Sequence, residues 1–130
     1  MVVVDASAVI AALSTQGANT LLMARLGGAT ELYAPQLLDI EILHALRRLV
    51  ATGQLSPERA QEVREDCASL RIQRYPHEPL ADRAWDLRDY LTPSDAIYVA
   101  LAEVLEVPLV TCDRRFQTAH PRGPVVEIFA

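Results

Sequence analysis

The sequence predicts an α/β fold, in which one domain has a central, mostly parallel β-sheet of about four to five strands flanked by helices. The segments 2–5 and 108–112 are short and apolar, as buried strands are, and amphipathic segments of helical period lie between them. Strands that alternate with helices favour a parallel sheet covered on both faces. The 130 residues contain no linker, repeat or low-complexity tract, so we expect one domain over residues 1–130.

The composition excludes several classes of protein. Hydrophobic residues are 51% of the chain, which argues against disorder. The longest apolar run, residues 96–102, is far shorter than the roughly 20 residues of a membrane span, and the N-terminus lacks the basic region of a signal peptide. Cys67 and Cys112 form no CxxC motif, which favours reduced thiols. We therefore expect a cytoplasmic protein without a membrane partner.

The charged residues narrow the choice further. The net charge of -5 argues against nucleic-acid binding by bulk electrostatics alone. All twelve basic residues are arginines. Because no lysine is present, the sequence excludes a P-loop, Schiff-base chemistry and the lysine-assisted phosphoacceptor aspartate of receiver domains.

The first half of the chain alternates strands with helices, and identifiable residues end several of them. Gly27 and Gly28 close one helix, and Pro35 stops a strand. The expected elements are a strand at 2–5, helices at 7–13 and 19–28, a strand at 31–35 and a helix at 36–53.

The second half begins with a helix that has a clear start. Ser56 suits the N-cap and Pro57 the first helical position. The expected elements are a helix at 56–70, a strand at 71–76, helices at 79–91 and 92–106, a strand at 108–112 and, after a turn at 121–124, a closing strand at 125–129.

Four acidic residues from distant segments are expected at one edge of this sheet. Asp5 and Asp113 follow strands, and open α/β sheets bind ligands at the carboxyl ends of their strands. Asp95 begins a helix that runs antiparallel to the strand it feeds, so the start of this helix lies at the same edge. Glu41 lies in the second turn of the helix that leaves the strand at 31–35.

Each of these acids also has a structural interpretation. Asp5, Asp95 and Asp113 stand where carboxylates cap helices and suit the helix dipole. Asp39 lies in the first turn of its helix, whereas Glu41 lies past the cap and flanks the apolar stripe. Geometry alone leaves both Asp39 and Glu41 as candidates for a site.

The four acids together favour a divalent cation. Clustered carboxylates repel and raise one another's pKa, and a bound cation relieves this repulsion. Ligands that are all oxygen favour Mg²⁺ or Mn²⁺ over zinc. Mg²⁺ in a carboxylate cluster most often serves phosphate chemistry, which makes phosphodiester hydrolysis the expected reaction.

The sequence around these acids resembles the motifs of PIN domains. The opening "VVVDASAVIAAL" resembles their D-x-S motif. The segment "APQLLDIEILHALRR" resembles the second motif, in which a glutamate follows the strand-ending proline by six residues, and this register selects Glu41 over Asp39. The segment "LTPSDAIYVALAEVLEVPLVTCDRRF" is similar to the third and fourth motifs. The match covers essentially the whole chain and resembles the VapC branch, the toxins of type II toxin–antitoxin systems.

The resemblance implies a Mg²⁺-dependent ribonuclease, with Mn²⁺ as a substitute cation. The implied catalytic and metal-binding carboxylates are Asp5, Glu41, Asp95 and Asp113, supported by the hydroxyls of Ser7 and Thr111. Many relatives have asparagine where this chain has His44, so His44 is open to a role at the site or a purely structural one. Arg47, Arg48, Arg114 and Arg115 are candidates for contacts with RNA phosphates, with intramolecular ion pairs as the alternative.

The resemblance also implies partners. These are an RNA substrate, a VapB-like antitoxin, a second copy of the chain in a homodimer, and a toxin–antitoxin hetero-oligomer. The helical segments 17–26 and 37–50 carry a surplus of apolar residues that suits a partner groove, although core packing explains most of it. Two other functions remain as alternatives, a non-catalytic PIN-like module that binds RNA or protein and a structure-specific DNA nuclease.

Overall fold

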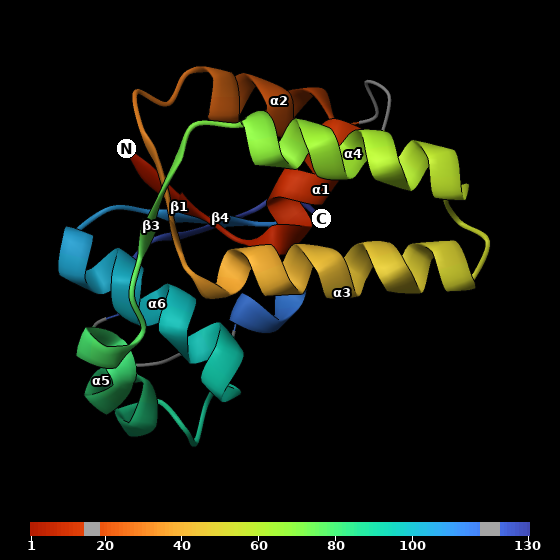
Figure 1. Ribbon diagram of the computed structural model, residues 1–130. Helices are drawn as coiled ribbons and strands as arrows, with labels where there is room; N and C mark the ends of the chain where they lie inside the picture. Colours follow the sequence, from red (N-terminus) through yellow and green to blue (C-terminus); the bar gives the residue numbers. More distant parts are fainter. Residues whose placement is uncertain (15–18, 118–122) are drawn as a thin grey trace.

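The sheet is five-stranded and entirely parallel, in the order β3-β2-β1-β4-β5. The structure is a computed structural model that describes residues 1–14, 19–117 and 123–130 (Figure 1). The strands are β1 (Val2–Val4), β2 (Leu32–Pro35), β3 (Ile72–Tyr75), β4 (Leu109–Thr111) and β5 (Val126–Ile128). The predicted α/β class and parallel sheet are confirmed.

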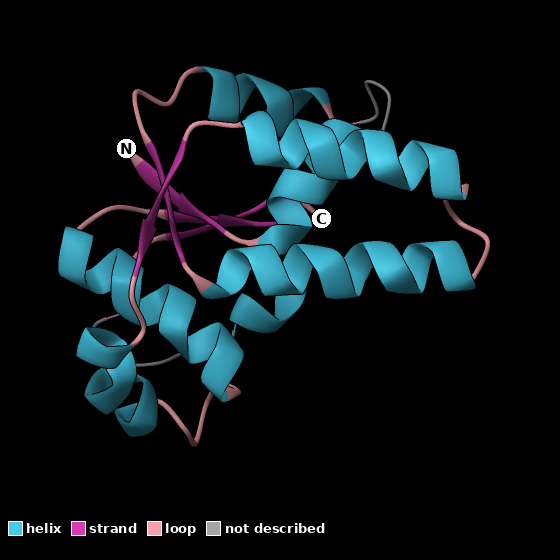
Figure 2. Ribbon diagram, viewed as in Figure 1, coloured by secondary structure: helices cyan, strands magenta, loops and turns pink. Residues whose placement is uncertain are grey.

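Helices cover both faces of this sheet, so the chain forms three layers (Figure 2). Helices α1, α3 and α4 pack together on one face, with α2 against α1, whereas α5 and α6 pack on the other. The α-helices in the described part of the chain are α1 (Ala6–Ser14), α2 (Thr20–Gly27), α3 (Leu37–Ala51), α4 (Pro57–Ser69), α5 (Ala81–Asp86) and α6 (Pro93–Leu105), and the 3-10 helices are η1 (Glu78–Leu80) and η2 (Arg114–Gln117). No helix within these described ranges is long and apolar enough to cross a membrane.

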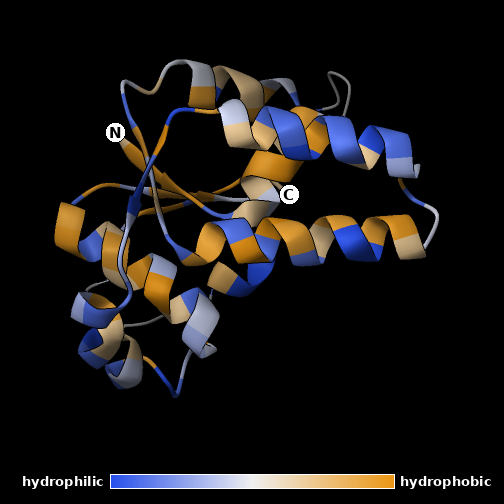
Figure 3. Cartoon of the chain, viewed as in Figure 1, coloured by the Kyte–Doolittle hydropathy of each residue, from blue (hydrophilic) through white to orange (hydrophobic). Residues whose placement is uncertain are grey.

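The alternation of side chains along β1 divides the core in two. Val2 and Val4 belong to the cluster under α1 to α4, whereas Val3 belongs to the cluster under α5 and α6. All three valines are fully buried, as expected for a central strand covered on both sides. Figure 3 shows the complementary pattern outside, where α4 is mainly hydrophilic along its length.

Strand β1 lies in the middle of the sheet. Strands β2 and β3 lie on one side of it, and β4 and β5 lie on the other. On one side Val3 pairs with Tyr33 of β2, and on the other Val4 pairs with Val110 of β4. Because all the strands run parallel, their carboxyl ends meet at one edge. Open α/β sheets place their ligands at such a switch point.

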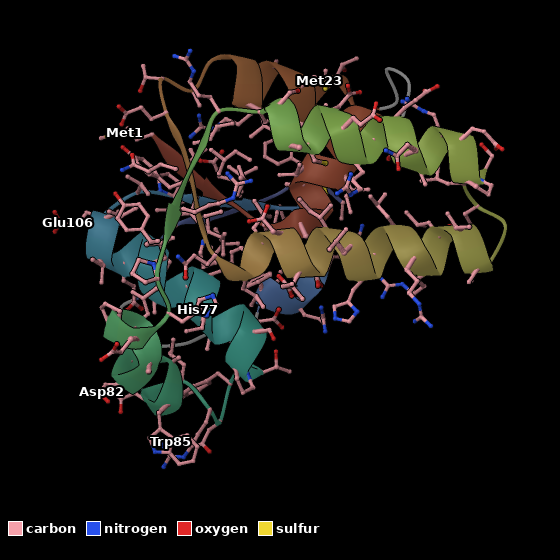
Figure 4. All side chains as sticks on the ribbon, viewed as in Figure 1. Met1, Met23, His77, Asp82, Trp85 and Glu106 are labelled. Carbon is pink, nitrogen blue, oxygen red and sulfur yellow. The ribbon has the colours of Figure 1, made fainter. Side chains whose placement is uncertain are left out.

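Local hydrogen bonds explain where the main helices begin. Ser56 accepts a hydrogen bond from the N–H of Arg59 at 3.1 Å, as its predicted N-cap position requires. Helix α3 has no side-chain cap of its own from Gln36. Instead, the N–H of Leu37 donates to Nε2 of His77 at 2.8 Å, and His77 lies near the start of α3 in Figure 4.

The helix expected at 79–91 is wrong in its extent. It is divided into η1 and the short α5, and residues 87–90 form turns. The N–H of Leu87 lies 3.2 Å from the carbonyl oxygens of both Arg83 and Ala84, so the helix tightens there and stops. Leu87 and Leu91 are nevertheless buried, which explains why their spacing resembled a helix. Part of the turn expected at 121–124 lies outside the described residues.

Candidate active site

A pocket of about 490 Å³ opens at the carboxyl edge of the sheet. Its walls come from α1, α3, α6 and the segment that follows β4. It is lined by all four predicted carboxylates, Asp5, Glu41, Asp95 and Asp113, and by Ala6, Ser7, Ile10, Ala11, Ser14, His44, Ala45, Arg48, Leu49, Tyr98 and Arg115. The structure thus brings together the acids that the topology argument expected at one edge.

Asp5 is buried and held by three donors. The Ser7 hydroxyl and the N–H of Ala8 donate to Oδ1 at 2.7 Å and 3.0 Å, and the Thr111 hydroxyl donates to Oδ2 at 2.6 Å. Burial raises the pKa of Asp5 above its usual value, the three hydrogen bonds oppose this, and the nearby Asp113 adds to it. Asp5 is therefore both the predicted helix cap and a rigidly oriented carboxylate in the pocket.

The two predicted hydroxyls join the end of β4 to the start of α1. Ser7 Oγ accepts a hydrogen bond from the N–H of Cys112 at 2.9 Å, and Thr111 Oγ1 accepts one from the N–H of Asp113 at 3.0 Å. Each hydroxyl donates its proton to Asp5. Ser7 and Thr111 therefore orient a carboxylate, and any contact of theirs with a metal or its waters stays a prediction.

Asp95 and Asp113 share a positive neighbour. The N–H of Arg115 donates to Oδ1 of Asp113 at 2.9 Å, and its guanidinium donates to Oδ2 at 2.8 Å and 2.5 Å. These bonds lower the pKa of Asp113 below its usual value. Arg115 also lies 4.0 Å from Asp95, which is buried in the first turn of α6. The guanidinium thus partly neutralises two of the four acids.

The two acids of α3 have different surroundings. Asp39 receives two hydrogen bonds from Arg74 of β3, at 2.7 Å and 2.9 Å. Glu41 is half-buried and lines the pocket. Asp39 therefore belongs to an exposed ion pair, whereas Glu41 lies in the pocket. Glu41 is the acid that the motif resemblance selected.

Only some of the basic residues predicted to contact RNA lie in the pocket. Arg48, Arg115 and His44 line the pocket, so three of the candidates lie beside the acids. Arg47 instead lines a shallow groove between α3 and α4. Arg114 is exposed and does not line the pocket that the described residues form. Contacts of Arg47 and Arg114 with RNA stay predictions.

Sequence reasoning missed Tyr98. Its side chain is 1% exposed and lines the pocket. Burial raises the pKa of Tyr98 well above its usual value, and the neighbouring Glu41 raises it further. Tyr98 and Glu41 do not meet hydrogen-bond geometry, so the hydroxyl has no partner among the described residues. The spacing Asp95-x-x-Tyr98 is a signal for it, since residues three apart share a helix face.

The pocket fits a hydrated Mg²⁺ ion better than a cation held by many side chains. Within residues 1–14, 19–117 and 123–130, no three His, Cys, Asp or Glu side chains gather into a ready-made metal cage. Mg²⁺ usually binds through one or two carboxylates and keeps several waters, so it needs no such cage. The remaining carboxylates and the unpaired Tyr98 hydroxyl are polar groups that those waters would satisfy.

Comparisons with known proteins agree with this fold and these motifs. Residues 2–120 match the family described as PIN domain. Ribonuclease VapC1 of Mycobacterium tuberculosis is 44% identical over 118 residues, which are 90% of this chain and 89% of that protein. Ribonuclease VapC12 of the same organism is 38% identical over 130 residues, covering 100% of both chains. The fold also matches the crystal structure of VapBC2 from Rickettsia felis bound to a DNA fragment from their promoter, with a TM-score of 0.70 and 13% identity over 100% of both chains. The chain therefore belongs to the PIN-domain family, in its VapC branch.

Proposed function

We propose that this chain is a Mg²⁺-dependent endoribonuclease toxin that hydrolyses RNA phosphodiester bonds in the carboxylate pocket. The observation that carries the proposal is the pocket itself, where four acids from four separate segments line one cavity at the switch point of the sheet. The relatives named ribonucleases support RNA as the substrate.

The pocket residues have distinct tasks in this proposal. Asp5, Glu41, Asp95 and Asp113 hold the cation, directly or through its waters. Bound Mg²⁺, or Mn²⁺ in its place, would lower the pKa of a water and neutralise charge on the phosphodiester. Ser7 and Thr111 keep Asp5 in one orientation, so the site is ordered before RNA arrives. Arg48 at the pocket binds phosphate oxygens, for which a guanidinium is well shaped. By resemblance, the products carry a 5′-phosphate and a 3′-hydroxyl.

We also propose a VapB-like antitoxin as a partner, in a hetero-oligomer with a homodimer of this chain. The fold neighbours described as toxin–antitoxin complexes support this. Exposed apolar side chains on α2 and α3, namely Leu21, Met23, Ile40 and Leu43, offer a partner the surface that the surplus of apolar residues suggested. Copurification of a small protein from the native operon tests the partner, and a chain that stays monomeric with every candidate antitoxin contradicts it.

Cleavage of a panel of structured RNAs, with mapping of the ends, tests the activity. We expect cleavage with Mg²⁺ and none with EDTA. The substitution Asp95→Asn is expected to reduce the rate by more than the roughly 10- to 100-fold that loss of an outer-shell partner costs. Equal rates for D95N and the parent contradict the assignment. Binding of RNA without cleavage favours a non-catalytic module instead, and cleavage of DNA flaps favours a DNA nuclease.

A further inference from the structure

Tyr98 places a buried hydroxyl without a hydrogen-bond partner in the wall of the carboxylate pocket. Its side chain is 1% exposed, and its hydroxyl is the single buried side-chain polar atom left unpaired in the part of the chain that the structure describes. Nearly all buried polar groups in proteins have a partner, and an unpaired one is costly. The Tyr98 hydroxyl therefore calls for a hydrogen-bond partner that the described residues do not supply in their present arrangement.

The surroundings of this hydroxyl are acidic. Burial raises the pKa of Tyr98, and the carboxylates of Glu41, Asp5 and Asp95 raise it further. A phenol keeps its proton at neutral pH, because its ordinary pKa is about 10. A protonated phenol can donate a hydrogen bond, and each of these three carboxylates can accept one.

The carboxylates of Glu41 and Asp95 accept no hydrogen bond from the described residues, and the nearest ion-pair contact of Asp95 is Arg115 at 4.0 Å. Asp5 has three donors, and Asp113 has the guanidinium of Arg115. No comparable set holds Glu41 among the described residues, although Tyr98 is its neighbour. The Glu41 carboxylate lies close enough to Tyr98 to raise the pKa of its hydroxyl, so this carboxylate is a candidate acceptor for it.

We propose that Tyr98 is a positioning residue of the metal site, whose hydroxyl donates to the Glu41 carboxylate when the pocket holds its cation. This inference rests on the proposed metal-dependent function. It assigns to α6 two contributions one turn apart, the carboxylate of Asp95 and the hydroxyl of Tyr98. Binding of the cation would then fix the pairing of this hydroxyl with Glu41.

The substitution Tyr98→Phe tests this pairing, because it removes the hydroxyl and keeps the ring. In EDTA we expect an unfolding midpoint equal to or above that of the parent, since an unpaired buried group is lost. On titration with Mg²⁺ we expect a dissociation constant about 10-fold higher or more, in line with the loss of an outer-shell partner. Calorimetry and the Mg²⁺-induced shift of the midpoint measure both quantities without RNA.

Tyr33→Phe is the matched control. Tyr33 is also buried, but its hydroxyl donates to Glu31 in the segment just before β2, away from the pocket. We expect Y33F to lower the midpoint slightly in EDTA, because it breaks a formed hydrogen bond, and to leave the affinity for Mg²⁺ unchanged.

Each outcome decides one of the two proposals. If Mg²⁺ shifts the midpoint of the parent and of Y98F equally, the Tyr98 inference is wrong and the metal site stands. If Mg²⁺ leaves the parent itself unchanged, the proposed metal-dependent function fails and the inference fails with it. A double-mutant cycle provides a second measurement, since the effect of Y98F on Mg²⁺ affinity should largely vanish in a Glu41→Gln background. Full additivity of the two substitutions also overturns the inference.

Discussion

At the scale of single residues, the two acids of α3 show what the sequence can and cannot predict. Two helical positions two apart differ by about 200° around the axis, so Asp39 and Glu41 cannot serve one site. The motif register identified Glu41, and Glu41 lines the pocket. The partner of Asp39 was not predictable, because Arg74 is 35 residues away and reaches it only through the pairing of β2 with β3.

The pair of substitutions Glu41→Gln and Asp39→Asn tests this separation. We expect E41Q to abolish measurable cleavage, since it removes a negative charge from the proposed metal site. D39N should cleave at the parental rate and lose at most about 1 kcal/mol of stability, because its ion pair is exposed. Initial rates with saturating Mg²⁺ and the urea midpoints of both proteins measure these effects. Equal losses of activity in the two variants count against the assignment.

Arg115 provides a second test at the residue scale, because its guanidinium and Mg²⁺ would compete for the same carboxylates. Its guanidinium bonds to Asp113 and approaches Asp95, so in the proposed metal site it would compete with Mg²⁺ for these two carboxylates. We expect Arg115→Gln to bind Mg²⁺ more tightly than the parent, as measured by calorimetry. Arg114→Gln is the control, because Arg114 is exposed beside it and does not line the pocket within the described residues. Weaker Mg²⁺ binding in R115Q contradicts the competition.

The pH dependence of the same variant follows from the lowered pKa of Asp113. A carboxyl whose folded pKa is depressed adds stability above its unfolded pKa of about 4, and this stability disappears as the pH falls through the folded pKa. In EDTA we therefore expect R115Q to be less stable than the parent at pH 7 and to match it near pH 2. A stability difference that persists at pH 2 shows that Arg115 acts through packing instead.

At the scale of elements, the start of α6 links stability to the site. Thr92 accepts a hydrogen bond from the N–H of Asp95 at 3.3 Å, so this cap fixes the turn that carries a pocket acid. Thr92→Val should cost about 1 kcal/mol and lower the cleavage rate. Ser56→Ala removes the equivalent cap of α4, far from the pocket lining, and should cost a similar free energy without changing the rate. Thermal denaturation and rate measurements on both variants check the contrast.

The elements differ in how well the sequence predicted them. The strand β1 and the helix α6 were clear, because an apolar run ends in an acid and a Thr-Pro pair starts a helix. The end of α5 at Leu87 was not predictable from the sequence. Buried leucines at helical spacing do not reveal which carbonyl oxygens a backbone N–H will bond. Tyr98 escaped notice for a related reason. Its meaning depends on Glu41 of another helix, and that proximity exists only after α3 and α6 pack around the same pocket.

At the scale of the whole molecule, charge and topology act together. Ion pairs join segments far apart in sequence, such as Arg25 of α2 with Glu127 of β5 and Arg83 of α5 with Glu103 of α6. Several arginines thus form ion pairs within the fold. The pocket is still lined by four acids, and the net charge of the chain is -5. An anionic pocket repels RNA until a cation enters, so metal binding controls both substrate binding and chemistry in the proposed function.

The two clusters of the core share the central strand, and we expect the domain to unfold as one unit. Val4→Ala removes buried methyl groups under α1 to α4, and Val3→Ala removes them under α5 and α6. Each should lower the free energy of unfolding by about 2–3 kcal/mol. Far-UV circular dichroism follows all the helices, whereas near-UV dichroism includes the buried tyrosines Tyr33 and Tyr98 of the second cluster. In both variants the two signals should move together to one lower urea midpoint. The contrary result is a V4A protein whose far-UV midpoint falls while its near-UV midpoint stays at the parental value. The two clusters would then unfold independently, and the central strand β1 would not couple them.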